Sequence, residues 1–193
     1  MKSVFKIFLI AALTLCVASA TALAATYTLD PKYSIILHRI KHLMGYSVGT
    51  FEKFNGTIEV DESKNKITAI DVTIDMDSLN TRHEVRDEDL RSEHFFDTKK
   101  FPNARFTAEK ISKDTITGEL TLKGVTRKVK LDYTWAGTGK DQYGNTKTAL
   151  SARGTIDRQD FGISHNFKAK DNKWVLGDEV ELTIEVQALR NDE

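Results

Sequence analysis

The stretch KITAIDVTIDMDS, residues 66–78, alternates apolar and polar side chains with a period of two. Its even positions from Ile70 to Met76 are apolar, and its odd positions from Asp71 to Asp77 are polar. Because successive side chains of a β-strand point to opposite faces of the sheet, this period predicts a half-buried strand. One dry face and one wet face are typical of an antiparallel sheet that packs on a core from one side.

Segments with the same alternation follow one another along the chain. We predict eight strands in all, at residues 34–42, 54–60, 66–78, 104–110, 115–122, 129–135, 149–157 and 180–188. Turn-forming sequences separate them, among them DESKN at 61–65 and KG at 123–124. Eight short-looped strands predict an all-β fold, either an antiparallel barrel or a sandwich. An eight-stranded, lipocalin-like barrel is favoured because a closed sheet has no exposed edges.

Small residues recur on the apolar side of these strands. They are Gly56, Ala104, Ala108, Gly118, Ala152 and Gly154. A barrel filled only for stability would carry Leu or Ile at such positions to reach the packing density of a protein core. We therefore interpret them as signs of an underfilled lumen that holds one apolar, elongated ligand. The alternative is that the glycines mark bends or bulges where the strands coil sharply.

The first 24 residues have the features of a signal peptide. Lys2 and Lys6 flank an apolar run, and Ala22-Leu23-Ala24 is the small-x-small pattern that a signal peptidase cleaves. We expect residues 1–24 to be removed on export and residues 25–193 to form a single domain. Cys16 lies in the removed part, so the exported chain has no cysteine for a disulfide, a thiol nucleophile or a metal ligand.

Charge and hydropathy limit the partners of the exported chain. Removing residues 1–24 takes away two of the 28 basic residues and none of the 28 acidic ones, which leaves 26 against 28 and a formal charge of −2. Nucleic-acid binding calls for a basic excess on one face, so we expect no nucleic-acid partner. After residue 24 there is no apolar run near the roughly 20 residues that a membrane helix needs, so we expect no integral membrane span.

Two of the five histidines, His83 and His94, lie in and just after the stretch HEVRD at residues 83–87. The helix of a zinc protease needs two histidines four positions apart, with a glutamate between them as the base. Here Asp87 stands at the position of the second histidine. An exported metal-dependent hydrolase would need His83, Asp87 and His94 to converge on one metal ion, and this is the alternative function.

A surface helix explains the same stretch without chemistry. Asp87 and Arg91 are four residues apart, a spacing at which opposite charges stabilise a helix, and Thr81 can cap its first turn. We predict a short surface helix over about residues 82–94 that covers one open end of the barrel as a lid. Its apolar anchors are expected to be Val85, Leu90, Phe95 and Phe96.

Other signatures of catalysis are missing from the sequence. Ser47 matches the bare G-x-S-x-G pattern at residues 45–49, but no helix is predicted after it, as a nucleophile elbow requires, and no glycine-rich phosphate loop occurs. We therefore expect binding without chemistry, with no catalytic residues, no metal and no cofactor apart from a bound lipid.

Several consecutive blocks of sequence occur in one order along the chain. They are S-x-I-x-x-x-I-x-H at 34–42, VGTFEKFNGTI at 48–58, DSLNTR at 77–82, RDEDLRSEHFFD at 86–97, FPNARF at 101–106, TGELTLKGVTRKV at 117–129 and DRQDFGI at 157–163. Together they resemble the YceI-like family. The resemblance implies a lipocalin-like barrel, secreted to the bacterial periplasm, that binds a polyisoprenoid or similar long amphiphile in its lumen. His38 departs from it, because such proteins usually carry an aromatic or aliphatic residue there.

The ligand contacts are predicted from the apolar side of the strands and from aromatic residues near their ends. The predicted contacts are His42, Phe54, Ile58, Ile70, Val72, Ile74, Met76, Phe106, Leu120, Leu122, Leu150, Phe161, Phe167, Trp174, Leu182 and Ile184. We expect His42, Arg82 and His94 near a polar head group. If His38 and His42 both face inward, they either meet that head group or hydrogen-bond to one another. The expected partner is an isoprenoid or quinone-like lipid, held for transport, storage or sequestration, with a homodimer as an open alternative to a monomer.

Overall fold

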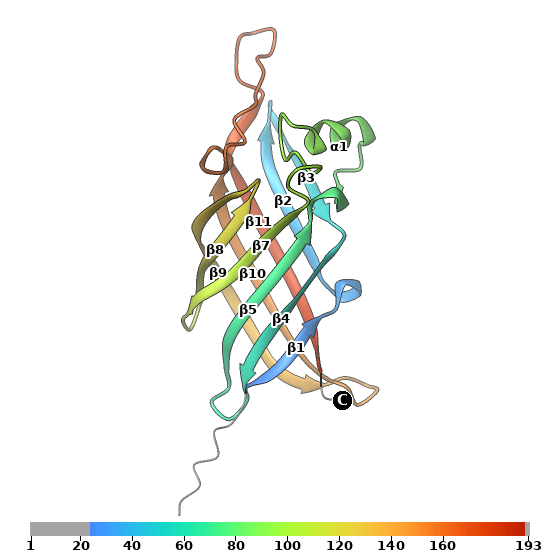
Figure 1. Cartoon of the computed structure of the whole chain (residues 1–193), viewed down its shortest axis with the longest axis vertical. Coiled ribbons are helices and arrows are strands. Elements are labelled where there is room, and N and C mark those ends of the chain that lie inside the picture. Colours follow the sequence, from blue (N-terminus) through green and yellow to red (C-terminus); the bar gives the residue numbers. More distant parts are fainter. Residues whose placement is uncertain (1–23, 192–193) are drawn as a thin grey trace, which may run out of the picture.

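A computed structural model describes residues 24–191, so most of the predicted signal peptide lies outside the described residues. Figure 1 shows long strands that wind around one axis, with a short helix at one end. The elements are β1 (Ala25–Leu29), η1 (Pro31–Tyr33), β2 (Ile35–His42), β3 (Gly45–Phe51), β4 (Phe54–Asp61), β5 (Lys66–Asp75), η2 (Met76–Ser78), β6 (Leu79–Asn80), α1 (Glu84–Arg91), β7 (Asn103–Ile111), β8 (Thr115–Leu122), β9 (Val125–Lys140), β10 (Thr146–Asp157), η3 (Arg158–Phe161) and β11 (Leu176–Arg190).

Eight of the described strands close into an antiparallel ring. Their order is β1-β4-β5-β7-β8-β9-β10-β11, and β11 pairs back with β1. Between neighbouring strands the apolar positions stand side by side, as in Ile58 beside Ile70 and Val72 beside Phe106. The predicted all-β, eight-stranded antiparallel barrel with a short helix is therefore confirmed.

The membership of the ring differs from the prediction at one strand. Residues 25–29 were not predicted as a strand, because five residues next to a signal peptide carry little alternation, yet they form β1. The strand predicted at residues 34–42 is β2 (Ile35–His42), which lies on the same edge of β11 as β1. Ser34 bridges the break between them, since its hydroxyl accepts from Gln187 N–H at 3.0 Å and donates to Gln187 O at 3.2 Å.

β2, β3 and β6 extend the wall beyond the ring at one end, and α1 follows β6 there (Figure 1). Residues 164–175, here called the arm, rise above the same end between η3 and β11. None of the helices formed by residues 24–191 has the length and apolar character needed to cross a membrane.

α1 is confirmed as a short helix at the barrel end, but its local contacts differ from the prediction. His83, not Thr81, is the N-cap, and its Nδ1 accepts from Arg86 N–H at 3.2 Å. Asp87 is buried and accepts from the backbone N–H of Thr81 at 2.9 Å, so it does not serve as an exposed partner of Arg91. Val85 is 70% exposed where it lines the cavity, whereas Phe95 is buried and Leu90 and Phe96 pack against the core.

The glycines of the inner face do not leave the space that we expected. A Cβ added at Gly118 would lie 2.4 Å from Thr107 O and 2.7 Å from the Phe106 ring. A Cβ at Gly154 would lie 2.6 Å from Cδ2 of Leu131. These positions are small because the chain and its neighbours approach closely there. A lumen is nevertheless present, and Ala104 and Ala152 line it.

Candidate ligand-binding site

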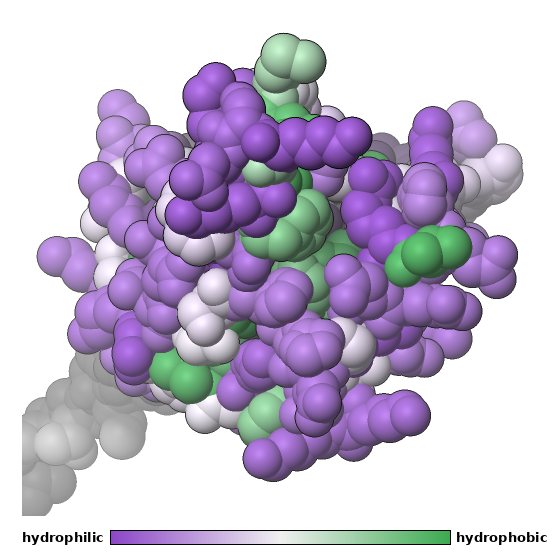
Figure 2. Space-filling view, turned by 90° about the horizontal axis from the view of Figure 1, so that it is seen from above, coloured by the Kyte–Doolittle hydropathy of each residue, from purple (hydrophilic) through white to green (hydrophobic). Residues whose placement is uncertain are grey.

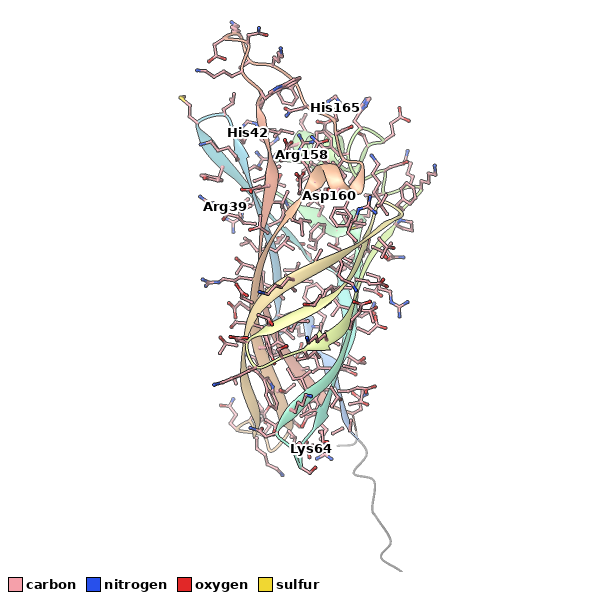
Figure 3. The ribbon with its side chains drawn as sticks, turned by 90° about the vertical axis from the view of Figure 1, so that its left-hand side faces the viewer. Arg39, His42, Lys64, Arg158, Asp160 and His165 are labelled. Carbon is pink, nitrogen blue, oxygen red and sulfur yellow. The ribbon has the colours of Figure 1, made fainter. Side chains whose placement is uncertain are left out.

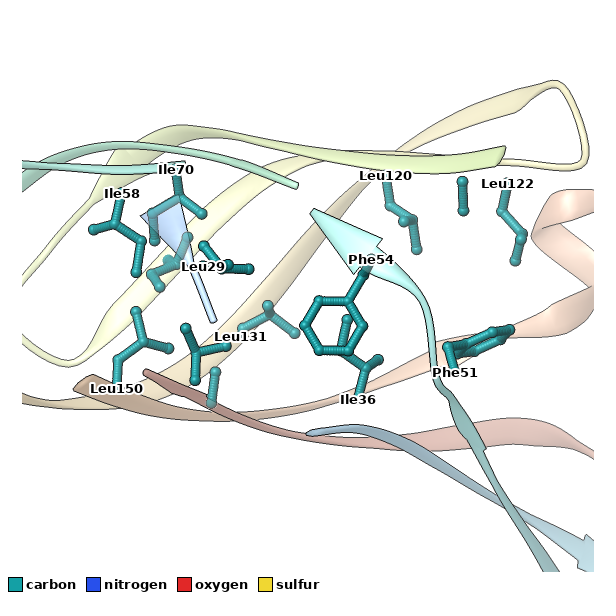
Figure 4. Close-up of a cluster of buried hydrophobic side chains, with 14 of the residues drawn as sticks. Leu29, Ile36, Phe51, Phe54, Ile58, Ile70, Leu120, Leu122, Leu131 and Leu150 are labelled. Atoms are coloured by element: carbon teal, nitrogen blue, oxygen red, sulfur yellow. The ribbon is translucent and has the colours of Figure 1, made fainter. Parts of the chain in front are cut away.

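The barrel encloses a cavity of about 710 Å³ that opens toward α1 and the arm. This volume lies within the range of small-molecule sites in proteins. Figure 4 shows part of the apolar cluster around it, with Ile58, Ile70 and Leu150 toward one end of the view and Leu120 and Leu122 toward the other. These side chains come from strands on all sides of the barrel, so the alternation that forms the sheet also forms the lining.

Most of the predicted contacts do line this cavity. They are His42, Ile58, Ile70, Val72, Ile74, Met76, Phe106, Leu120, Leu122, Leu150, Phe167, Leu182 and Ile184. Most of them lie at strand positions whose side chains point into the barrel, and Phe167 lies on the arm. The structure therefore brings together most of the residues that the alternation of apolar and polar side chains predicted to face inward.

Five predicted residues lie elsewhere. Phe54 and Phe161 are buried in the surrounding core outside the cavity lining. Trp174 is 62% exposed on the arm. Arg82 is exposed at a turn with a φ of 62°. His94 stacks on His165, with the two ring centroids 4.9 Å apart.

Polar side chains line the cavity only near its α1 end, where they form a polar collar. Only part of this collar was predicted from the sequence. The collar consists of His38, His42, Ser47, His83, Arg86, Asp89 and Arg158. The histidines of β2 were expected to face inward, and both do. Ser47, Arg86, Asp89 and Arg158 were missed, because a lone polar residue on a strand or helix carries no signal in the local pattern.

His38 is a buried titratable group of the collar. It is 9% exposed, packs 5.4 Å from the Phe51 ring centroid, and occupies the space beside Gly49. Burial, and after it the positive charge of Arg86, lower the pKa of His38 to about 4, although Asp87 acts in the opposite direction. Its Nδ1 has no hydrogen-bond partner within residues 24–191, so this atom does not make the bond to His42 that was one of the two alternatives.

Two buried networks hold the elements of the open end in place. Thr81 Oγ1 donates to Asp87 and accepts from Arg86 Nε at 2.8 Å, which ties α1 to the end of β6. Arg158 is 3% exposed and donates to three backbone carbonyls, those of Ile163, His165 and Gly177. Its ion pair with Asp178 measures 2.8 Å.

Figure 3 places Arg158, His165, His42 and Asp160 at this end and Lys64 at the opposite one. The bonds of Arg158 therefore fasten the base of the arm to the open end of the barrel. In Figure 2, which looks down on this end, hydrophobic surface is visible between polar side chains.

The residues of the alternative metal site are not brought together. His83 caps α1, Asp87 is bound to Thr81, and His94 stacks on the ring of His165. Among residues 24–191, no group of three His, Cys, Asp or Glu side chains is arranged to hold a metal ion.

Comparison with known proteins identifies the family. The model of the YceI-like domain matches residues 27–188. The chain belongs to the YceI-like family. A UPF0312 protein of Pectobacterium atrosepticum is 39% identical over 187 residues, which cover 93% of this chain and 94% of that one.

Solved structures share the barrel. The YceI protein of Campylobacter jejuni is 32% identical, with a TM-score of 0.63 over 75% of this chain and 85% of that one. A polyisoprenoid binding domain from Saccharophagus degradans, implicated in plant cell wall breakdown, has a TM-score of 0.62 at 16% identity, and covers 86% of this chain and 99% of that one. At this identity the second likeness shows the fold alone.

Proposed function

We propose that this chain is an exported binding protein that holds a polyisoprenoid or a similar long amphiphile in its barrel, for transport, storage or sequestration. The observation that carries the proposal is the cavity of about 710 Å³, with an apolar lining that turns polar only at the open end. Burying a few hundred Å² of an isoprenoid tail contributes several kcal/mol, at roughly 25 cal/mol per Å², before ordering costs are subtracted. Affinity therefore comes mainly from the tail.

The polar collar sets the orientation of the ligand. An amphiphile with its tail among Ile58, Ile70 and Leu150 has its head group near His38 and Arg86 at the open end. No reaction is required of these residues, because the proposed activity is binding and release. The polyisoprenoid binding domain from S. degradans, which has the same fold, supports this class of ligand.

The cellular place of the protein is part of the proposal. Export through cleavage after Ala24 would deliver the chain to the periplasm of a bacterium. Intact mass spectrometry of protein recovered from a periplasmic extract tests this, since the mass must correspond to a chain that begins at Ala25. A chain that keeps residues 1–24 in that fraction contradicts it. Light scattering of the same sample distinguishes a monomer from the homodimer allowed by the sequence.

Filling the lumen tests the binding function. Ala152 lines the cavity and is 3% exposed, whereas its neighbour Arg153 lies on the outer face of β10. Ala152→Phe is expected to weaken binding of a fluorescent long-chain polyprenol at least tenfold, because the added ring occupies the space of the tail. Arg153→Phe is the matched control and is expected to bind normally. Circular dichroism checks that both variants fold, and equal affinity in both would contradict a luminal site.

A further inference from the structure

Two neighbouring tips at the open end expose large apolar side chains. The first is the turn between β2 and β3, where Met44 is 97% exposed and Leu43 is 46% exposed. The second is the arm, where Trp174 is 62% exposed and Phe167 is 47% exposed. The backbone N–H of Leu43 donates to Val175 O at 2.7 Å, so the two tips form one continuous surface, here called the rim.

The rim is basic, although the whole chain has a formal charge of zero. Residues 39–46 and 164–175 together contain five Lys or Arg residues and a single acidic residue, Asp171. Lys41, Lys168, Lys170 and Lys173 are exposed. Positive charge is thus gathered on the rim itself, and α1, at the same end but outside the rim, carries acidic side chains.

Aromatic and basic side chains are interleaved on the arm. Lys168 Nζ lies 5.0 Å from the centroid of the Trp174 ring. Exposed Trp beside Lys is typical of the interface between water and lipid, where the ring enters the head-group layer and the ammonium groups meet lipid phosphates. A Met at the tip of the β2–β3 hairpin fits the same environment, because its side chain is apolar and almost fully exposed.

We propose that the rim docks the barrel onto an anionic lipid bilayer. Apolar side chains enter the head-group layer, and the lysines contact acidic lipid head groups. Phe167 and His42 belong both to this end and to the lining of the cavity, so the path from bilayer to lumen is continuous. A docked barrel exchanges an apolar ligand with the membrane without carrying its tail through water.

Vesicle binding tests the docking directly. Protein recovered after export, with the loss of residues 1–24 verified by mass, is mixed with vesicles of phosphatidylcholine, or of phosphatidylcholine with about one third phosphatidylglycerol, and sedimented. We expect the protein to sediment with the anionic vesicles at low salt, and this fraction to fall in high salt, since exposed charges are screened. Absence of binding to anionic vesicles, or equal binding to neutral ones, would overturn the proposal.

Variants at the two ends of the barrel provide the matched comparison. Trp174→Glu with Met44→Glu, and separately the triple change of Lys168, Lys170 and Lys173 to Ser, are expected to reduce vesicle binding at least tenfold. Tyr143→Glu is the control, because Tyr143 is 80% exposed in the β9–β10 turn, outside the rim. An equal loss of binding in the control variant would overturn the rim as the docking surface.

The same variants separate docking from ligand binding. Uptake of a fluorescent polyprenol offered in solution is expected to be unchanged in the rim variants, while its transfer from anionic vesicles slows at least tenfold. Transfer at the wild-type rate would overturn the proposal. Loss of uptake from solution in every protein, wild type included, would instead count against the proposed luminal binding.

Discussion

At the scale of single residues, His38 places a titratable group inside an apolar barrel. Its pKa is lowered to about 4, mainly by burial, against about 6.5 in an unfolded chain. Below pH 6.5 the unfolded chain therefore takes up a proton that the folded protein does not. Folding stability is expected to fall between pH 6.5 and 4, with no contribution above that range. The maximum effect is about 3 kcal/mol, from 1.36 kcal/mol per pKa unit.

His38→Phe tests this pH dependence. The variant removes the titrating group and keeps a ring of similar shape beside Phe51 and Gly49. Urea denaturation at pH 7 and pH 4.5 is expected to show a smaller acid destabilisation in His38→Phe than in the wild type. Equal losses in the two proteins would mean that other groups cause the acid sensitivity.

Gly118 and Gly139 provide a second test at this scale. Both lie in strands, but a Cβ at Gly118 meets Thr107 O and the Phe106 ring, whereas a Cβ at Gly139 meets nothing within 4 Å. Gly118→Ala is expected to cost about 1–3 kcal/mol in the free energy of unfolding, the usual cost of overpacking a core. Gly139→Ala is expected to be neutral or slightly stabilising, because it restricts the unfolded chain. Similar values for both would show that Gly118 has room after all.

At the scale of elements, the arm depends on one buried side chain. Arg158 binds the carbonyls of Ile163, His165 and Gly177, so its removal leaves buried acceptors without donors. Arg158→Gln is expected to lower the melting temperature by several degrees and to speed hydrogen exchange and proteolysis within residues 164–175. Arg39→Gln is the control, because the Arg39–Glu181 pair is exposed and such pairs contribute little. Unchanged protection of the arm in Arg158→Gln would contradict the anchoring role.

The elements also show what sequence could and could not predict. β5 and β10 were predicted because their alternation is set by one buried and one solvated face, which is a local property. β1 was missed because it is short and is defined by its pairing with β4 and β11, which are distant in sequence. The N-cap of α1 was misplaced for a similar reason, since Thr81 is engaged by Asp87 and Arg86.

The site residues also divide into those that a local sequence pattern predicts and those that depend on distant contacts. Val72, Leu120 and Ile184 line the cavity. They were predicted because the alternation along each strand shows which side chains point inward. The rim aromatic Trp174 and the collar residue Arg158 depend on how the arm folds over the end of the barrel, and no local pattern encodes that.

At the scale of the whole molecule, the account depends on a closed barrel whose interior is completed by an apolar guest. The most direct measurement is mass spectrometry of an organic extract of freshly purified protein, compared with the same protein after delipidation and reloading with a polyprenol. We expect a long-chain apolar species in the fresh extract and about one polyprenol per chain after reloading, with Ala152→Phe retaining little of either. An extract free of such a species, together with wild-type protein that takes up no polyprenol, would contradict the account.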